Sequence, residues 1–178
     1  FDSSDIQNVN PTVDPVRDLE IIETEMMLAD LESIQKRLEK NNKKNVDESI
    51  IKILEHALEC INNDKDISVL KNQFDKKLLN QSGLLSLKPK IFVCNVDEKS
   101  VQSGNNYSKS FIDKFGQGNT LVISADIENQ INELDIDERK NYMDMIGLKS
   151  TGLSLLIQKA YNILGLETYF TSGPEETR

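Results

Sequence analysis

The residues best suited to ligand chemistry are an amide and a carboxylate three positions apart, Asn95 and Glu98. An asparagine amide offers both donors and an acceptor, whereas an ionised carboxylate only accepts hydrogen bonds. Two such groups together can read the hydrogen-bonding edge of a heterocyclic ligand. The spacing alone carries little weight, because Asn and Glu are common in loops, and Asn95 as the cap of a turn is the alternative interpretation.

Two short apolar runs, at 90–94 and 120–123, predict buried strands that position this pair. The segment 107–115 between them has the character of a helix, and the order strand, helix, strand is typical of a parallel α/β unit. Ligands collect beyond the carboxyl ends of strands in such sheets. Asn95 follows the first strand and Ser124–Ala125 follows the second, so we expect both at one edge of the sheet.

The two loops together look like the base-recognition half of a P-loop nucleotide-binding domain. In GTPases of that kind the first loop reads Asn-Lys-x-Asp, and the Asp carboxylate accepts from N1–H and the amino group of guanine. Here Glu98 is one methylene longer and Val96 stands at the Lys position, so the guanine-specific contact is not reproduced. Adenine presents an acceptor at N1, which disfavours a carboxylate there. Asn95 can still bond the purine edge that adenine and guanine partly share.

The composition excludes several classes of function. The 178 residues carry a net charge of −9 at pH 7 and contain 6% aromatic residues and no Trp. This disfavours a general grip on nucleic-acid phosphates, aromatic stacking platforms and sequence-specific DNA binding. One His and two Cys are too few for a four-ligand zinc site or a disulfide scaffold, and we expect reduced cysteines in the cytoplasm. No run reaches the roughly 18–20 apolar residues that span a membrane.

Ahead of the strands, the sequence predicts helices. Residues 16–44 contain no Gly or Pro and carry apolar residues at three-and-four spacing, namely Leu19, Ile22, Met26 and Ala29. After a polar turn at 41–45, a second helix is predicted around 50–61 and a third helical stretch over 67–79. Two long helices joined by a short turn pack as an antiparallel hairpin, here a coiled coil.

A basic cluster lies near the tip of the predicted hairpin, and its members are Lys36, Arg37, Lys40, Lys43 and Lys44. At an exposed tip these cations could contact the phosphates of RNA. A solvated helix end is the alternative, since cations are favoured near a helix C-terminus. Charge alone favours that alternative.

Three acidic residues, Asp135, Asp137 and Glu138, could bind a divalent metal or act as paired carboxylates. A simpler account is the start of a helix over 135–145, with Asp135 as the cap and Glu138 as its capping-box partner. We therefore expect no metal-ligating and no catalytic residue in this chain. His56 and Cys94 are expected to be packing residues.

The C-terminal part is predicted as an apolar helix over 153–164, ended by Gly165. Residues 167–171 have the character of a strand without a partner in this chain. Because a lone strand cannot satisfy its edges, and because no initiator Met is present, we expect a piece of a longer protein.

With these residues placed, the sequence resembles the YchF-type, Obg-like ATPases, a branch of the P-loop GTPases. The resemblance runs in the right order over essentially the whole chain. The matching stretches are residues 13–25 with 28–32, Leu87-Lys88-Pro89 followed by Asn95-Val96-Asp97-Glu98, Ser124-Ala125-Asp126-Ile127-Glu128, and Gly147-Leu148 and Gly152-Leu153 with residues 166–173.

The resemblance implies an ATP or GTP hydrolase that uses Mg²⁺ and associates with the ribosome or ribosomal RNA. It implies three parts: a G domain, an inserted helical coiled coil and a ubiquitin-like TGS domain. By matching positions, Asn95, Val96 and Glu98 would lie at the base, with contacts from Ser124 and Ala125.

One departure from the family is that the chain has no Gly-x-x-x-x-Gly-Lys-Ser/Thr loop to cradle phosphates. In the family that loop lies in the N-terminal half of the G domain, so we expect this chain to be inactive in hydrolysis without that half. The expected fold is α/β, the C-terminal half of a G domain carrying a helical hairpin. The expected parts are an irregular lead-in (1–15), the coiled-coil insert (16–86), the second half of the G domain (87–165) and the start of a TGS domain (166–178).

Overall fold

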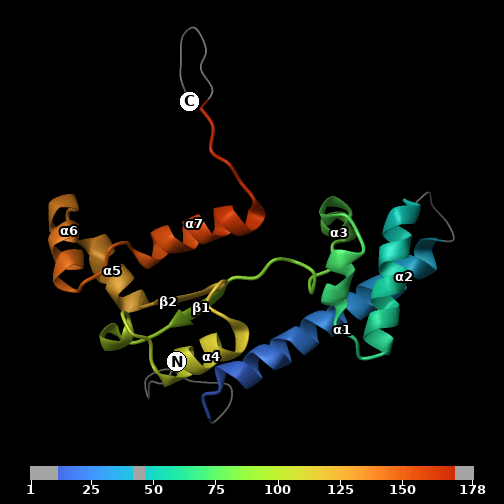
Figure 1. Ribbon diagram of the computed structural model, residues 1–178, viewed down its shortest axis with the longest axis horizontal. Coiled ribbons are helices and arrows are strands. Elements are labelled where there is room, and N and C mark those ends of the chain that lie inside the picture. Colours follow the sequence, from blue (N-terminus) through green and yellow to red (C-terminus); the bar gives the residue numbers. More distant parts are fainter. Residues whose placement is uncertain (1–11, 42–46, 171–178) are drawn as a thin grey trace, which may run out of the picture. The chain divides into compact units, whose positions relative to one another are not determined.

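The structure, a computed structural model, describes residues 12–41 and 47–170, with the backbone alone at residues 40 and 41. The chain divides into two compact units (Figure 1). Val16–Lys88 form a helical unit, and the residues up to Pro15 together with those from Pro89 onward form an α/β unit. None of the described helices is long and apolar enough to cross a membrane.

The helical unit contains α1 (Pro15–Asn41), α2 (Glu48–Asn62), the 3₁₀ helix η1 (Ile67–Asn72) and α3 (Lys76–Ser82). Helix α2 confirms the helix predicted around 50–61. The apolar side chains of the unit form one core, and its most deeply buried members are Ile34, Ile53, Leu54, Leu70 and Leu84. The predicted turn lies, beyond Asn41, outside the described residues.

The apolar seam expected along α1 is only partly buried. Ile22 is 51% exposed and Ala29 is exposed, whereas Asp30 and Ile34 are buried. Helix α2 has 15 residues against 27 in α1, and the core gathers around Ile34 in the C-terminal half of α1. The three-and-four spacing therefore predicted the helix correctly, but it did not predict which face of α1 the helical unit buries.

Buried Asp30 ties α1 to the segment that leaves α3. Its Oδ1 accepts from the backbone N–H of Leu85 at 2.7 Å, and its Oδ2 accepts from that of Ser86 at 2.8 Å. Asp30 is 2% exposed, so both oxygens satisfy donors that water cannot reach easily. A guanidinium N–H of Arg37, two turns along α1, donates to the carbonyl of Ser82. These bonds hold residues 82–86 against α1.

The predicted third helical stretch is two separate helices, η1 and α3, instead of one. Asp66 accepts from the N–H of Ser68 at 2.8 Å and caps η1, and Asp75 accepts from the N–H of Lys77 at 2.8 Å and caps α3. An Asp side chain that bonds to the backbone two residues on starts a new helix instead of continuing the old one.

The α/β unit confirms the predicted parallel pair of strands. Strands β1 (Phe92–Asn95) and β2 (Thr120–Ile123) pair in parallel, with Phe92 opposite Thr120 and Asn95 opposite Ile123. Helix α4 (Asn106–Phe115) connects them. The expectation that β1 is buried was wrong, because Val93 is 44% exposed. Of the two strands, β2 contacts both α4 and α7 (Gly152–Leu164), which leaves β1 more open.

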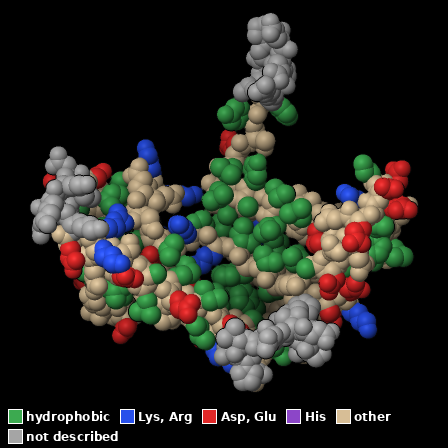
Figure 2. All heavy atoms as spheres, turned by 180° about the vertical axis from the view of Figure 1, so that it is seen from behind, with side chains coloured by type: hydrophobic (Ala, Val, Ile, Leu, Met, Phe, Trp, Pro, Cys, Tyr) green, Lys and Arg blue, Asp and Glu red, His purple; other side chains and the backbone are tan. Residues whose placement is uncertain are grey.

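Alternating side chains place two helices on opposite faces of this pair of strands. Phe92 stacks edge-on against Phe111 of α4, with ring centroids 5.3 Å apart. Ile123, whose paired position in β1 is Asn95 and not Phe92, lies on the other face against Gly152 at the start of α7. Figure 2 shows hydrophobic side chains gathered over α7 and the strands.

Helix α5 (Ala125–Glu133) was not predicted, because its first residues were interpreted as a loop. Its signal is Ile127 and Ile131, four positions apart and 2% and 3% exposed. Helix α6 (Ile136–Met145) follows it as expected. The predicted capping box is wrong, since Asp135 occupies the cap position but its side chain makes no capping hydrogen bond.

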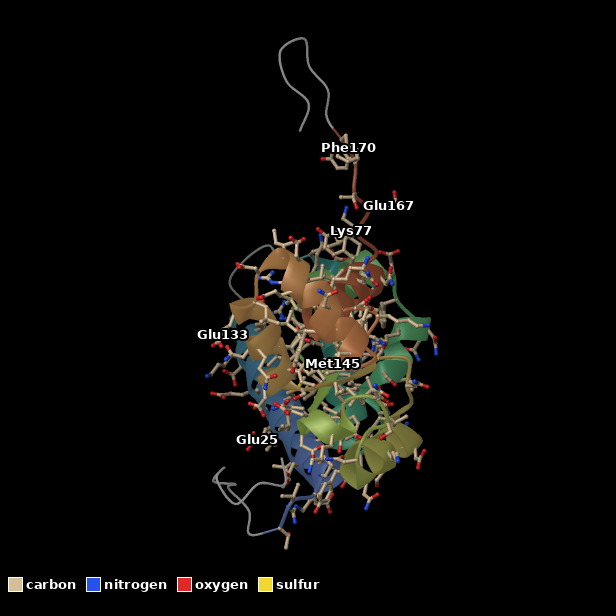
Figure 3. The ribbon with its side chains drawn as sticks, turned by 90° about the vertical axis from the view of Figure 1, so that its left-hand side faces the viewer. Glu25, Lys77, Glu133, Met145, Glu167 and Phe170 are labelled. Atoms are coloured by element: carbon tan, nitrogen blue, oxygen red, sulfur yellow. The ribbon has the colours of Figure 1, made fainter. Side chains whose placement is uncertain are left out.

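Helix α7 ends at Gly165, which has a φ of +67°, as predicted. The left-handed conformation suits glycine because it has no Cβ. The strand predicted over 167–171 is wrong as far as the structure describes it, since residues 166–170 form no strand. Phe170 in this segment is 86% exposed and projects away from α7 (Figure 3).

Candidate functional site

The loops after β1 and β2 meet through the side chain of Asn95. Its Oδ1 accepts from the backbone N–H of Ala125 at 2.9 Å, although the two residues are 30 positions apart. The backbone N–H of Val96 also donates to the carbonyl of Ile123 at 2.8 Å and extends the pairing of the strands. The expected meeting of Asn95 and Ser124–Ala125 at one edge is therefore observed.

Asn95 caps a helix, and not the turn that follows it. Ala125 is the first residue of α5, and its N–H has no partner within that helix. Ser124, at the cap position, makes no side-chain capping bond, so Asn95 does so from the neighbouring strand. The turn after β1 is capped by Asp97, which accepts from the N–H of Ser100 at 3.0 Å.

Two of the predicted site residues are buried beneath these loops. Val96 is 2% exposed, so its side chain packs in the interior. Ser124 is 1% exposed, and its hydroxyl has no hydrogen-bond partner among the described residues. An unpaired buried hydroxyl is costly and is a polar group that a ligand or water could satisfy. The lone buried hydroxyl beside Ala125 is therefore consistent with a binding site at this edge.

Glu98 is exposed and is held by a residue that the sequence did not point to. Its Oε1 accepts from Nε2 of Gln130 on α5, and Oε1 of Gln130 accepts from the hydroxyl of Tyr142 on α6. Because α5 was not predicted, no sequence signal placed Gln130 beside Glu98.

The start of α7 is fixed from the same side of the unit. The carboxylate of Glu128 on α5 accepts from the N–H of Gly152 at 2.6 Å and from that of Leu153 at 3.2 Å. A Cβ on Gly152 would lie 2.6 Å from Cγ2 of Ile123 and 3.0 Å from the Glu128 carboxylate. The close approach of α7 to β2 therefore requires glycine at this position.

We expect Gly152→Ala to lower the free energy of unfolding by about 1–3 kcal/mol, because the added methyl overlaps a buried side chain. Gly118→Ala is the matched control, since a Cβ at Gly118 meets nothing within 4 Å. Thermal unfolding of both variants measures the difference. Equal melting temperatures for the two variants would contradict the packing described here.

Two members of the basic cluster have described side chains, and both are engaged. Lys36 pairs with Glu32 one turn earlier on α1, and this contact lowers the pKa of the Glu32 carboxyl. Arg37 is half-buried and donates to Ser82, as described above. The side chain of Lys40, and Lys43 and Lys44 entirely, lie outside the described residues.

No metal centre forms in the described part of the chain, where no three His, Cys, Asp or Glu side chains come together to hold an ion. His56 packs edge-on against Phe74 at 5.4 Å, and its Nδ1 lies 2.7 Å from the carbonyl of Lys52. Partial burial raises the pKa of the Cys94 thiol. These contacts fit the packing roles expected for both residues.

No family model matches the chain. The chain is 36% identical over 190 residues to a ribosome-binding ATPase YchF from Bacillus subtilis and 30% identical over 185 residues to one from Escherichia coli O157:H7. Both comparisons cover the whole chain. The chain is related to the YchF family. It spans about half the length of these curated YchF relatives, 51% in each case.

A solved YchF structure supports the same relationship. The YchF GTPase of Schizosaccharomyces pombe matches the whole chain with a TM-score of 0.74 and 28% identity, over 51% of its own length. The helix-rich α/β fold with its parallel strands therefore corresponds to part of a YchF G domain, as the sequence predicted.

Proposed function

We propose that this chain supplies the base-binding part of a purine-nucleotide-binding protein, with ATP preferred to GTP. The observation that carries the proposal is the hydrogen bond from the Ala125 N–H to Asn95 Oδ1, which joins the two loops. The relatives are called an ATPase and a GTPase, which supports a purine nucleotide as the ligand.

The orientation of the Asn95 amide suits a purine ring. Because Oδ1 accepts from Ala125, the Nδ2 donors point elsewhere. Adenine and guanine both present an acceptor at N7. An Nδ2–H donated to N7 would hold either base, so Asn95 supplies affinity without choosing between them.

Selectivity would come from Glu98. A carboxylate can accept from the N6 amino group of adenine, but it faces repulsion from the N1 acceptor of that base. Guanine offers N1–H and an amino group side by side, which a two-oxygen contact would favour. We infer that Glu98, held by Gln130, contacts a single donor and thereby favours adenine.

Hydrolysis would need more than these residues. The 178 residues hold no Gly-x-x-x-x-Gly-Lys-Ser/Thr loop, and the relatives are about twice as long as the chain. We infer that phosphate and Mg²⁺ are held by groups outside the part described here. Turnover of ATP would then belong to the longer protein, and the 178 residues alone would not hydrolyse ATP.

The proposal is tested with the protein expressed from its whole coding sequence, titrated with ATP and with GTP by calorimetry. We expect ATP to bind more tightly, and Glu98→Asp to lower the ATP:GTP affinity ratio about tenfold, the effect of one charged hydrogen bond. Glu167→Asp, at another exposed position, is the control. Binding of neither nucleotide, or a ratio that Glu98→Asp leaves unchanged, would contradict the proposal.

A second proposal is that the protein docks on the ribosome in the cytoplasm through the basic cluster at the tip of the helical hairpin. It is supported by the name of the relatives, ribosome-binding ATPase. Lys36 is exposed and can exchange Glu32 for a phosphate, whereas Arg37 is committed to Ser82. We therefore assign phosphate contacts to the lysines and a packing role to Arg37.

We expect replacement of the four lysines, Lys36, Lys40, Lys43 and Lys44, by Ala to weaken pelleting with ribosomes. The slope of binding against salt should flatten by about 0.7–0.9 for each phosphate that is no longer neutralised by a lysine. The control is Lys76→Ala with Lys77→Ala, two exposed cations on α3. Arg37→Ala should instead lower the melting temperature. Pelleting unchanged at low and moderate salt would rule out this role for the cluster.

A further inference from the structure

A directional chain of hydrogen bonds leads from Glu98 into the α5–α6 pair, whose ends are marked by Glu133 and Met145 in Figure 3. The Tyr142 hydroxyl donates to Oε1 of Gln130, and Nε2 of Gln130 donates to Oε1 of Glu98. Gln130 and Tyr142 are half-buried, whereas Glu98 is exposed. The chain therefore connects an exposed carboxylate to groups with restricted freedom.

Chemistry fixes the direction of this chain. A carboxylate accepts and cannot donate, so Gln130 must turn its NH₂ group toward Glu98. The amide oxygen then faces α6, where it needs a donor, and the single O–H of Tyr142 is such a donor. Without that hydroxyl the amide can rotate by 180° and present its oxygen to the carboxylate, which would repel it. Tyr142 therefore fixes which end of Gln130 meets Glu98.

We propose that Gln130 and Tyr142 are positioning residues that set the base selectivity of Glu98, a proposal that rests on the proposed function. Gln130 draws one carboxylate oxygen toward α5 and leaves the other for the base. One oxygen suits the single amino group of adenine. Release of the carboxylate would free both oxygens for the paired N1–H and amino donors of guanine.

The test is titration of the protein from its whole coding sequence with ATP and GTP, for Gln130→Leu and Tyr142→Phe. We expect both variants to lower the ATP:GTP affinity ratio, by about 3- to 10-fold, in keeping with the loss of one hydrogen bond. Tyr142→Phe removes only a hydroxyl, so it keeps the test valid if Gln130→Leu does not fold. Tyr161→Phe on α7 is the matched control and should leave the ratio unchanged.

The ratio separates positioning from a merely structural role, because a loosened fold weakens both nucleotides alike. An unchanged ratio in both variants, with Asn95→Ala still weakening both nucleotides, would overturn this inference and leave the proposed function standing. Unchanged binding in Asn95→Ala would overturn the proposed function, and this inference with it.

Discussion

Asp30→Ala will lower the free energy of unfolding of the helical unit by about 2–4 kcal/mol. The substitution leaves the N–H groups of Leu85 and Ser86 without their acceptors in a place that is 2% exposed. An unsatisfied buried donor costs about 1–3 kcal/mol, and here two are created at once. Urea unfolding followed by the helical circular dichroism signal measures the loss.

Two companion variants sharpen this test. Asp30→Asn keeps one acceptor oxygen, so its loss should fall between those of wild type and Asp30→Ala. Glu25→Ala changes an exposed acidic residue on the same helix and should alter stability little. If Asp30→Ala and Glu25→Ala unfold at the same urea concentration, Asp30 does not hold residues 85 and 86 in place.

Asn95→Ala will weaken binding of ATP and GTP together, by about tenfold or more. The variant loses both the proposed contact to N7 and the bond that holds Ala125, each of the order of 1 kcal/mol. Because N7 is common to both bases, the ATP:GTP affinity ratio should stay near its wild-type value. Calorimetric titration with each nucleotide measures the affinities and the ratio.

Asn132→Ala is the control for this variant, because Asn132 is an exposed residue of α5 away from the two loops. Asn95→Asp is informative as well, since it keeps an acceptor for Ala125 and loses the Nδ2 donors. It should bind nucleotides as weakly as Asn95→Ala. A wild-type affinity in Asn95→Asp would mean that Asn95 serves only to cap α5.

Local pattern was enough to predict much of the fold. The alternation and length of the apolar run at 120–123 predicted β2, and the three-and-four spacing after Asp47 predicted α2. The left-handed cap at Gly165 followed from residue type. The face that α1 buries could not be predicted, because it depends on where the shorter α2 ends against it.

The candidate site was predictable only as far as strand order reaches. The rule that ligands bind beyond the carboxyl ends of parallel strands brought Asn95 near Ser124 and Ala125. The bond between Asn95 and Ala125 depends on the register of the strands, which sets Asn95 opposite Ile123. The contact of Gln130 with Glu98 spans 32 positions and a helix that was not predicted, so no local pattern indicated it.

The same limit applies to polar residues in the helical unit. Asp30 lies within a helix among other acidic residues, and its sequence neighbours give no sign that it is buried. Its partners are 55 and 56 positions away, so only the folded chain shows them.

Photolabelling with azido-ATP, carried on the adenine ring, tests most directly that the base lies against these two loops. The protein from its whole coding sequence is labelled, digested and mapped by mass spectrometry, with and without excess ATP. We predict labels on the peptides that carry Asn95–Glu98 and Ser124–Ala125, removed by excess ATP and reduced in Asn95→Ala. Competable labels found only outside these two peptides would contradict the account.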